Sequence, residues 1–176
     1  VNIENAESVA KAIMKKISPE AWRWVRMASM AGDPDKAQAI YRFLNIGFST
    51  GKAVCCQLAN DYVLAVFKMM RRVGRESDKL MGFVRFHELT SGVLFSTISP
   101  KHQQLYILGE HFSDRMPGEN WVIFDELRQM ACIHRAHQGF VVLKDVPVNL
   151  KKAEAFSKAE EDFSKLWKTF FDHIEI

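Results

Sequence analysis

Residues 82–100 read GFVRFHELTSGVLFSTISP, and this stretch decides the fold class. It contains two apolar runs that alternate in part with polar residues, over 83–89 and 93–98, with Ser91-Gly92 between them. Two such runs joined by a glycine-containing turn predict a β-hairpin. Ser99-Pro100 ends the second predicted strand, because proline cannot donate a hydrogen bond to a neighbouring strand.

Further strands are predicted after the hairpin, over 121–124, about 130–134 and 140–143. A helix is predicted over 103–116, because Leu105, Leu108 and Phe112 recur at helical spacing. We therefore expect one antiparallel sheet of about five strands with helices on one side, which is an α+β fold.

Helical patterns flank this sheet on both sides along the chain. Before it, apolar spacing predicts helices over 6–17, from Pro19, from about residue 35 and from about residue 61. Ser18 is a suitable cap for the second of these, since proline fits the first helical position. After the sheet, an aromatic stripe from Phe156 to Ile174 predicts a C-terminal helix. We expect one domain over 1–176, with a helical part (1–79), a sheet part (80–147) and a terminal helix (150–175).

Composition narrows the class of protein. The 176 residues are 48% hydrophobic and 26% charged with a formal net charge of +3, the balance of an ordinary folded domain. No apolar run approaches the roughly 18 residues of a membrane span. Cysteines 55, 56 and 132 are odd in number and two are adjacent, which favours a reducing, cytoplasmic compartment over a disulfide framework.

The first candidate site is a polar pair in the first hairpin strand. Arg85 and His87 are two residues apart, so the period of a strand places them on one face together with Phe83. One interpretation is a patch that binds a phosphate or a base, with Phe83 or Trp121 as a stacking surface. The alternative is an ordinary solvated face of the sheet.

A second candidate cluster lies in the predicted helix over 103–116. His111 stands one helical turn from Asp114 and from Arg115. An aspartate beside a histidine can orient its imidazole for general acid–base catalysis. A buried, hydrogen-bonded histidine or an ion pair on the helix surface would explain the same residues. The histidine spacings match no known metal site, and we expect neither a metal nor a cofactor.

Asp125 and Arg128 form a third candidate, directly after the strand over 121–124. One interpretation is that they bracket an anion or that Asp125 pairs with Arg115. The other is a buried arginine–carboxylate network that holds strand to helix. The candidate catalytic residues are therefore His111, Asp114 and Asp125. The candidate phosphate- or nucleic-acid-binding residues are Arg85, His87, Arg115, Trp121 and Arg128.

A fourth candidate is a run of basic residues that share one face of a predicted helix. They are Lys68, Arg71, Arg72 and Arg75. Such a face can contact phosphates. Glu76 and Asp78 follow at once, however, and the net charge is small, so a solvated helix face is the alternative. The chain has no phosphate-binding loop, dinucleotide-binding loop or nucleophile elbow.

Several segments resemble, in order, the motifs of a known family. They are RFLNIGF (42–48), GFVRF (82–86), SPKH (99–102), HFSDR (111–115), WVIFDELR (121–128) and LWKTFFDHIEI (166–176). Over nearly its whole length the chain is similar to a bacterial family of DNA-metabolism proteins. Members are linked by gene neighbourhood to a DNA-repair radical-SAM protein, and some are fused to a uracil-DNA glycosylase domain. They usually carry a further strand–helix segment at the start and a short tail at the end, so we expect this chain to be trimmed.

The resemblance implies a role in DNA metabolism, with DNA, a uracil-DNA glycosylase or the radical-SAM protein as partners, and it leaves the reaction open. We expect first an accessory module that binds nucleic acid or a repair enzyme through a patch lined by His and Arg. The second hypothesis is an enzyme acting on a nucleotide or DNA end, with His111 as the acid–base. The third is an interaction scaffold without a site, docking through its C-terminal helix.

Overall fold

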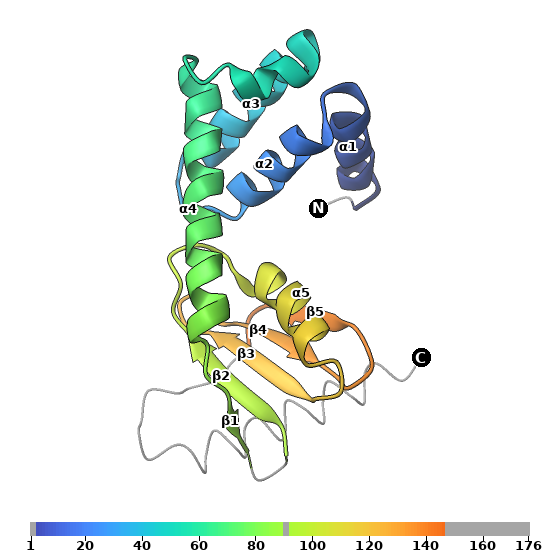
Figure 1. Cartoon of the computed structure of the whole chain (residues 1–176), viewed down its shortest axis with the longest axis vertical. Coiled ribbons are helices and arrows are strands. Elements are labelled where there is room, and N and C mark those ends of the chain that lie inside the picture. Colours follow the sequence, from blue (N-terminus) through green and yellow to red (C-terminus); the bar gives the residue numbers. More distant parts are fainter. Residues whose placement is uncertain (1–2, 90–91, 147–176) are drawn as a thin grey trace. The chain divides into compact units, whose positions relative to one another are not determined.

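The computed structural model describes residues 3–89 and 92–146, so the predicted C-terminal helix over 150–175 lies outside the described residues (Figure 1). The chain forms two compact units. The first, here called the helical unit, contains the residues up to Lys79 together with Lys101–Gln104. The second, the sheet unit, contains Leu80–Pro100 and the described residues from Leu105 onward. None of the helices described is long and apolar enough to cross a membrane.

The helical unit is built from the predicted helices. They are α1 (Ile3–Lys16), α2 (Pro19–Ser29), α3 (Lys36–Thr50), the short 3-10 helix η1 (Gly51–Cys56) and α4 (Asp61–Phe83), whose last four residues belong to the sheet unit. The predicted cap of α2 is confirmed, because the Ser18 hydroxyl accepts a hydrogen bond from the Ala21 N–H at 3.0 Å. The core includes Trp24, whose ring lies 6.0 Å from Phe43 and 5.1 Å from Phe67.

A short segment of chain, Lys101–Gln104, is fixed to the helical unit by a polar network centred on Glu76. The Glu76 carboxylate accepts hydrogen bonds from the main-chain N–H groups of Lys101 (2.7 Å) and His102 (2.9 Å). It also accepts one from the side-chain amide of the fully buried Gln104 at 3.0 Å. Burial raises the pKa of Glu76, but these three hydrogen bonds outweigh it and hold the pKa below its ordinary value.

His102 is the titratable anchor of the same segment. Its side chain is 3% exposed, and its Nδ1 accepts a hydrogen bond from the Gly32 N–H at 3.1 Å. Burial lowers the pKa of His102, because the imidazolium loses its hydration, and this outweighs the attraction of Glu76 and Asp33. The unfolded chain therefore binds the proton more readily, and stability is lost as the pH falls below the ordinary value of 6.5.

We accordingly expect the wild-type melting temperature to fall between about pH 7.5 and about pH 5.5. In His102→Asn the amide oxygen keeps an acceptor for the Gly32 N–H but cannot titrate, so its melting temperature changes less over this range. Differential scanning fluorimetry of both proteins provides the measurement. The window avoids Glu76, whose contribution is lost only below its ordinary pKa of 4.5. Parallel profiles for the two proteins would contradict the assignment.

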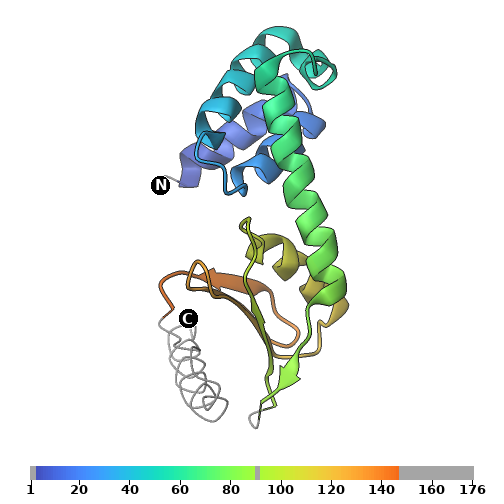
Figure 2. The ribbon, with the colours of Figure 1, turned by 90° about the vertical axis from the view of Figure 1, so that its left-hand side faces the viewer.

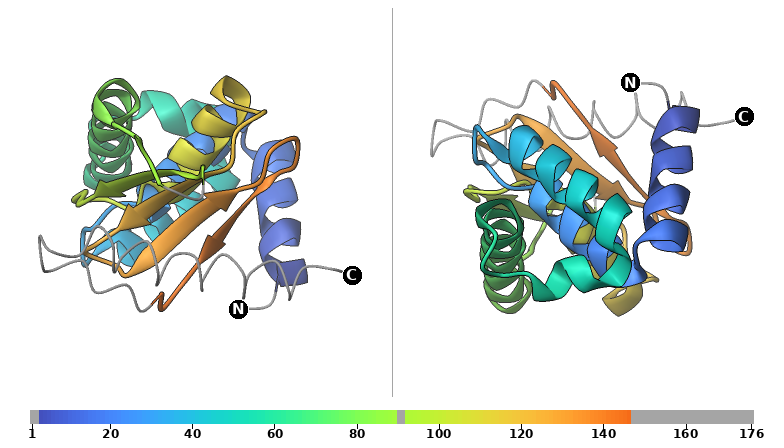
Figure 3. Two further views of the ribbon diagram at one scale, coloured as in Figure 1. Left: turned by 90° about the horizontal axis from the view of Figure 1, so that it is seen from below. Right: turned by 90° about the horizontal axis from the view of Figure 1, so that it is seen from above.

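The sheet unit contains five described strands and one complete helix. They are β1 (His87–Glu88), β2 (Leu94–Ile98), α5 (Leu105–Arg115), β3 (Trp121–Asp125), β4 (Met130–His134) and β5 (Phe140–Leu143). The strands lie side by side in the order β1-β2-β3-β4-β5 (Figure 3). This confirms the α+β class and the positions of the last three strands.

The sheet is mixed, so the prediction of a purely antiparallel sheet is wrong. Strands β2 and β3 are parallel, with Leu94 opposite Trp121 and Ile98 opposite Asp125, whereas the other three pairs are antiparallel. The physical reason is the helix between them. A crossover of a dozen or more residues returns the chain to the starting end of the sheet, and α5 supplies it.

The predicted first strand over 83–89 is also mostly wrong, because only His87 and Glu88 are in a strand. Helix α4 continues instead to Phe83, and the Val84 N–H still donates to the Leu80 carbonyl at 2.8 Å. The alternating residues 84–86 therefore form a short link between α4 and β1. Its apolar residues Val84 and Phe86 pack against the core beneath α5.

Each face of the sheet carries a cluster of buried apolar residues. Helix α5 contacts β4 and β5 (Figure 2). On that side its residues Leu105, Leu108 and Phe112 share one cluster with Trp121 and Ile123. The other face carries a second cluster, which contains Phe95, Val122, Phe124 and Ile133. Strand β3 is buried on both faces, which is typical of a central strand.

Candidate nucleic-acid interface

A pocket of about 480 Å³ opens in the sheet unit where α4 ends. Three pieces of chain form it: the end of α4, the segment before β1, and the outer edge of β2. Its lining residues are Leu80, Phe83, Val84, Arg85, His87, Phe95, Ser96, Thr97, Ile98 and Ser99. The pocket brings together Arg85 and His87, and no aspartate or glutamate is among its described lining residues. We call it the Arg85 pocket.

Arg85 is oriented by the end of α4. Its Nη1 donates hydrogen bonds to the carbonyl oxygens of Gly82 (3.1 Å) and Val84 (3.2 Å). A cation is favourable there, because the last carbonyls of a helix carry partial negative charge. The remaining guanidinium nitrogens are exposed and have no polar partner among residues 3–89 and 92–146. Two residues earlier, the Phe83 ring is 74% exposed.

The opposite wall is an open edge of β2. Strand β1 covers this edge only as far as the pair His87–Phe95. Leu94 and Ile98 use main-chain groups on the β3 side, where the Leu94 N–H donates to Asn120 and the Ile98 carbonyl accepts from Glu126. By the alternation of a strand, Thr97 directs its N–H and carbonyl to the opposite edge, which has no strand partner in the described structure.

This arrangement suits a ligand with a flat ring and an anionic group. A guanidinium binds phosphate or carboxylate oxygens through paired N–H donors. An exposed aromatic ring provides a stacking surface for a base. The open main-chain edge of Thr97 adds a donor and an acceptor. The alternation of residues 83–89 predicts that Arg85 and His87 lie on one face. The main-chain groups of Thr97 are exposed at the pocket only because β1 is short, and the sequence pattern does not predict that length.

Trp121 lies outside the Arg85 pocket and is fully buried. Its ring stacks on His134 with 4.8 Å between ring centres and an angle of 7°. Its other neighbours include Phe112, edge-on at 6.3 Å. The ring therefore offers no face to a base, and of the two residues predicted to stack on a base only Phe83 is exposed. The cause is the central position of β3 beneath α5.

Asp125 and Arg128 form a network within the protein. The fully buried Asp125 carboxylate accepts hydrogen bonds from the N–H groups of Leu127 (3.1 Å) and Arg128 (3.2 Å), and from Arg128 Nη1 at 2.9 Å. Arg128 Nη1 also donates to the Pro100 carbonyl at 3.0 Å. These bonds form a network within the protein, but they connect the turn after β3 to Pro100 and do not join a strand to a helix.

The residues of α5 are not arranged as an oriented acid–base pair. His111 Nε2 is buried without a hydrogen-bond partner, and its ring lies edge-on to Phe112 at 4.9 Å. Asp114 and Arg115 are exposed, and neither makes a hydrogen bond or ion pair within the described part of the chain. Over the same residues no three His, Cys, Asp or Glu side chains lie close enough to hold a metal ion.

The two buried cysteines behave as apolar core residues. Burial raises the pKa of Cys132 to about 12. Burial also raises the pKa of Cys55 to about 11, with a smaller contribution from Glu20. Neither thiol is ionised at neutral pH, so neither carries the thiolate that nucleophilic chemistry requires.

The chain matches one known protein-family model over most of its length. Residues 34–176 match the model of a domain of unknown function, DUF4130. The matched range contains the whole of the Arg85 pocket as well as α3, α4 and every described strand. No curated protein and no solved structure matches the chain significantly.

Proposed function

The chain belongs to the DUF4130 family, and we propose that it is an accessory protein of DNA metabolism that binds nucleic acid through the Arg85 pocket. The observation that carries this proposal is the grouping of Phe83, Arg85 and His87 around one pocket whose described lining contains no acidic side chain. The sequence resemblance to DNA-metabolism proteins supports the same class of ligand. The partner enzyme that this resemblance implies, a uracil-DNA glycosylase or a radical-SAM protein, would act on the bound DNA.

In this proposal a base stacks on the Phe83 ring while a neighbouring phosphate binds Arg85. A base–aromatic stack contributes about 1–3 kcal/mol and tolerates any base, because every base has a π-face. The exposed guanidinium nitrogens of Arg85 supply the charge-assisted hydrogen bonds to phosphate. His87 and the free edge of Thr97 complete the wall with polar groups. The alternative in which His111 acts as an acid–base requires a carboxylate that orients its ring, and His111 Nε2 has no hydrogen-bond partner among the described residues.

The test separates the base from the phosphate. We expect dTMP to bind more tightly than thymidine or inorganic phosphate alone, measured as chemical-shift changes in NMR titrations of the full chain. Phe83→Ala should weaken dTMP binding at least about fivefold, which corresponds to the lower limit of one stacking contact. Arg85→Gln should weaken dTMP binding and abolish the advantage of dTMP over thymidine.

Two control variants are matched in chemistry and lie outside the pocket. Arg23→Gln removes an exposed arginine of α2, and Phe48→Ala removes an exposed phenylalanine of α3. Both should leave dTMP binding unchanged. Equal dTMP affinity in Phe83→Ala, Arg85→Gln and the wild type would overturn the proposed pocket, as would the absence of dTMP binding at low salt.

A further inference from the structure

We infer that the exposed basic face of α4 is a second contact surface, which holds the phosphodiester backbone of a nucleic-acid strand. The surface consists of Lys68, Arg71, Arg72 and Arg75, and we call it the α4 stripe. All four residues belong to the helical unit and none belongs to the Arg85 pocket. The inference rests on the proposed function for the class of ligand, and it adds a different surface with a different role.

The α4 stripe lines a groove of about 330 Å³ together with Phe67, and the described lining contains no acidic residue. Lys79 continues the same helix face, because it follows Lys68 by eleven residues, or about three turns. The stripe with Lys79 is therefore roughly 16 Å long at about 1.5 Å per residue. Successive phosphates of one strand of B-DNA rise about 3.4 Å, so this length can face several of them.

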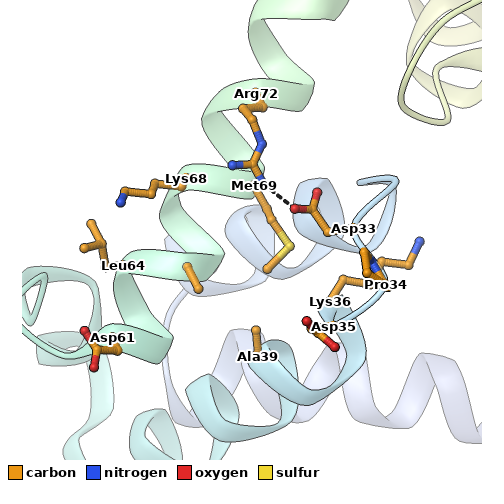
Figure 4. Close-up of a pocket in the computed structure, with 11 residues that line it drawn as sticks. Asp33, Pro34, Asp35, Lys36, Ala39, Asp61, Leu64, Lys68, Met69 and Arg72 are labelled. Atoms are coloured by element: carbon orange, nitrogen blue, oxygen red, sulfur yellow. Dashed lines mark hydrogen bonds and ion pairs between the residues drawn. The ribbon is translucent and has the colours of Figure 1, made fainter.

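Two of the guanidinium groups are held in position before any ligand binds. Arg72 pairs with Asp33 at 2.6 Å, and Figure 4 shows this contact between α4 and the loop before α3. Arg71 lies over the ring of Phe67 at 5.8 Å. Planar guanidinium groups fixed in this way lose less side-chain entropy when they bind phosphate. Lys68 extends from α4 in the same view without a partner among the described residues.

Two acidic residues follow the stripe in sequence, and neither pairs with it among the described residues. Asp78 is exposed and makes no ion pair there. Glu76 is directed to Lys101, His102 and Gln104, which satisfy its carboxylate. The carboxylate of Glu76 is therefore not available to neutralise the stripe, which leaves Asp78 as its exposed acidic neighbour in sequence. Arg75 and Lys79 make no ion pair in the part of the chain that the structure describes.

Acidic side chains next to the stripe limit where a nucleic-acid strand can lie on α4. A neighbouring pocket of about 360 Å³ shares Lys68 and Arg72 with the stripe but also contains Asp33, Asp35 and Asp61 (Figure 4). Those carboxylates lie on the side of α3 and the start of α4, and they repel phosphate. A nucleic-acid backbone is therefore expected on the other side, along Arg71 and Arg75 and the Phe67 groove.

The experiment compares two variants of the full chain that carry the same net charge. The stripe variant is Lys68→Gln/Arg71→Gln/Arg75→Gln. The control variant is Lys15→Gln/Lys16→Gln/Arg23→Gln, which changes exposed basic residues of α1 and α2. Each lowers the formal net charge from +3 to 0. Arg72 is left unchanged, because its ion pair with Asp33 belongs to the fold.

Fluorescence anisotropy then measures the affinity for labelled single- and double-stranded DNA of about 20 nucleotides, from about 25 to about 200 mM KCl. Loss of three phosphate contacts should reduce the slope of log affinity against log salt by about 2 for the single strand or about 3 for the duplex. At about 50 mM salt the stripe variant should bind more than about tenfold more weakly than the control variant. The form of DNA with the larger effect is the one the stripe holds.

Equal slopes for the stripe and control variants would overturn the inference. A second contradicting result would be polyglutamate that displaces DNA from the stripe with the same affinity as unlabelled DNA at the same ionic strength. The surface would then fit an acidic protein equally well. Failure of the Arg85 pocket gives a different result. In that case dTMP does not bind, while DNA still binds with a slope that depends on the stripe. If the stripe does not bind DNA, dTMP still binds, and the slope of log DNA affinity against log salt is the same in the stripe variant and the control variant.

Discussion

Asp125→Ala is expected to lower the free energy of unfolding by about 3–5 kcal/mol. The Asp125 carboxylate is fully buried and accepts three hydrogen bonds, two from main-chain N–H groups and one from Arg128. Alanine would leave those N–H groups without their acceptor and would remove the carboxylate partner of the partly buried Arg128 guanidinium, which keeps its hydrogen bond to the Pro100 carbonyl. Removing one partner of such a pair costs more than the pair itself contributes, because the remaining charge is still desolvated.

Urea denaturation of the full chain measures this effect, and Asp114→Ala is the matched control. Asp114 is an exposed aspartate in the last turns of α5 without a described partner, so its loss should change the free energy of unfolding by less than about 0.5 kcal/mol. Equal unfolding free energies for the two variants would therefore contradict a structural role for Asp125.

Much of the fold follows from local patterns in the chain. The Ser18-Pro19 start of α2, the strand over 130–134 and the strand over 140–143 lie where turn signals and apolar spacing predict them. Two features depend on information that those local patterns lack. The continuation of α4 through Gly82 is one, because the alternation of the following residues has the period of a strand. The parallel pairing of β2 with β3 is the other.

The parallel pair could have been inferred from the predicted elements. A helix was predicted between the two strands, and a connection of that length suits a crossover. The run Trp121-Val122-Ile123-Phe124 has no polar residue, which indicates a strand buried on both faces. Such a strand cannot present Trp121 to a ligand. By contrast, the mutual placement of Arg85, Phe83 and Thr97 depends on the shortness of β1, which no local pattern in this sequence indicates.

Trp121→Ala is expected to lower the free energy of unfolding by about 3–5 kcal/mol, the typical cost of removing a large aromatic side chain from a core. The ring is fully buried, stacks on His134 and meets Phe112 and Phe86 edge-on or tilted. Its removal leaves a cavity beneath α5 that these neighbours can fill only in part. Trp121→Phe keeps most of the ring volume, so its loss should be smaller, and it keeps the prediction testable if the alanine variant does not fold.

Phe83→Ala provides the opposite case in the same unit. The Phe83 ring is 74% exposed, so its removal should change the unfolding free energy by less than about 0.5 kcal/mol, while dTMP binding falls. Trp121→Phe should show the reverse pattern: lower stability in urea denaturation and unchanged dTMP affinity. The two aromatic residues are thereby assigned separate roles, Trp121 in the core and Phe83 in the pocket. A loss of dTMP affinity in a folded Trp121→Phe protein, with Phe83→Ala unaffected, would reverse that assignment and return the ligand to the α5 face of the sheet.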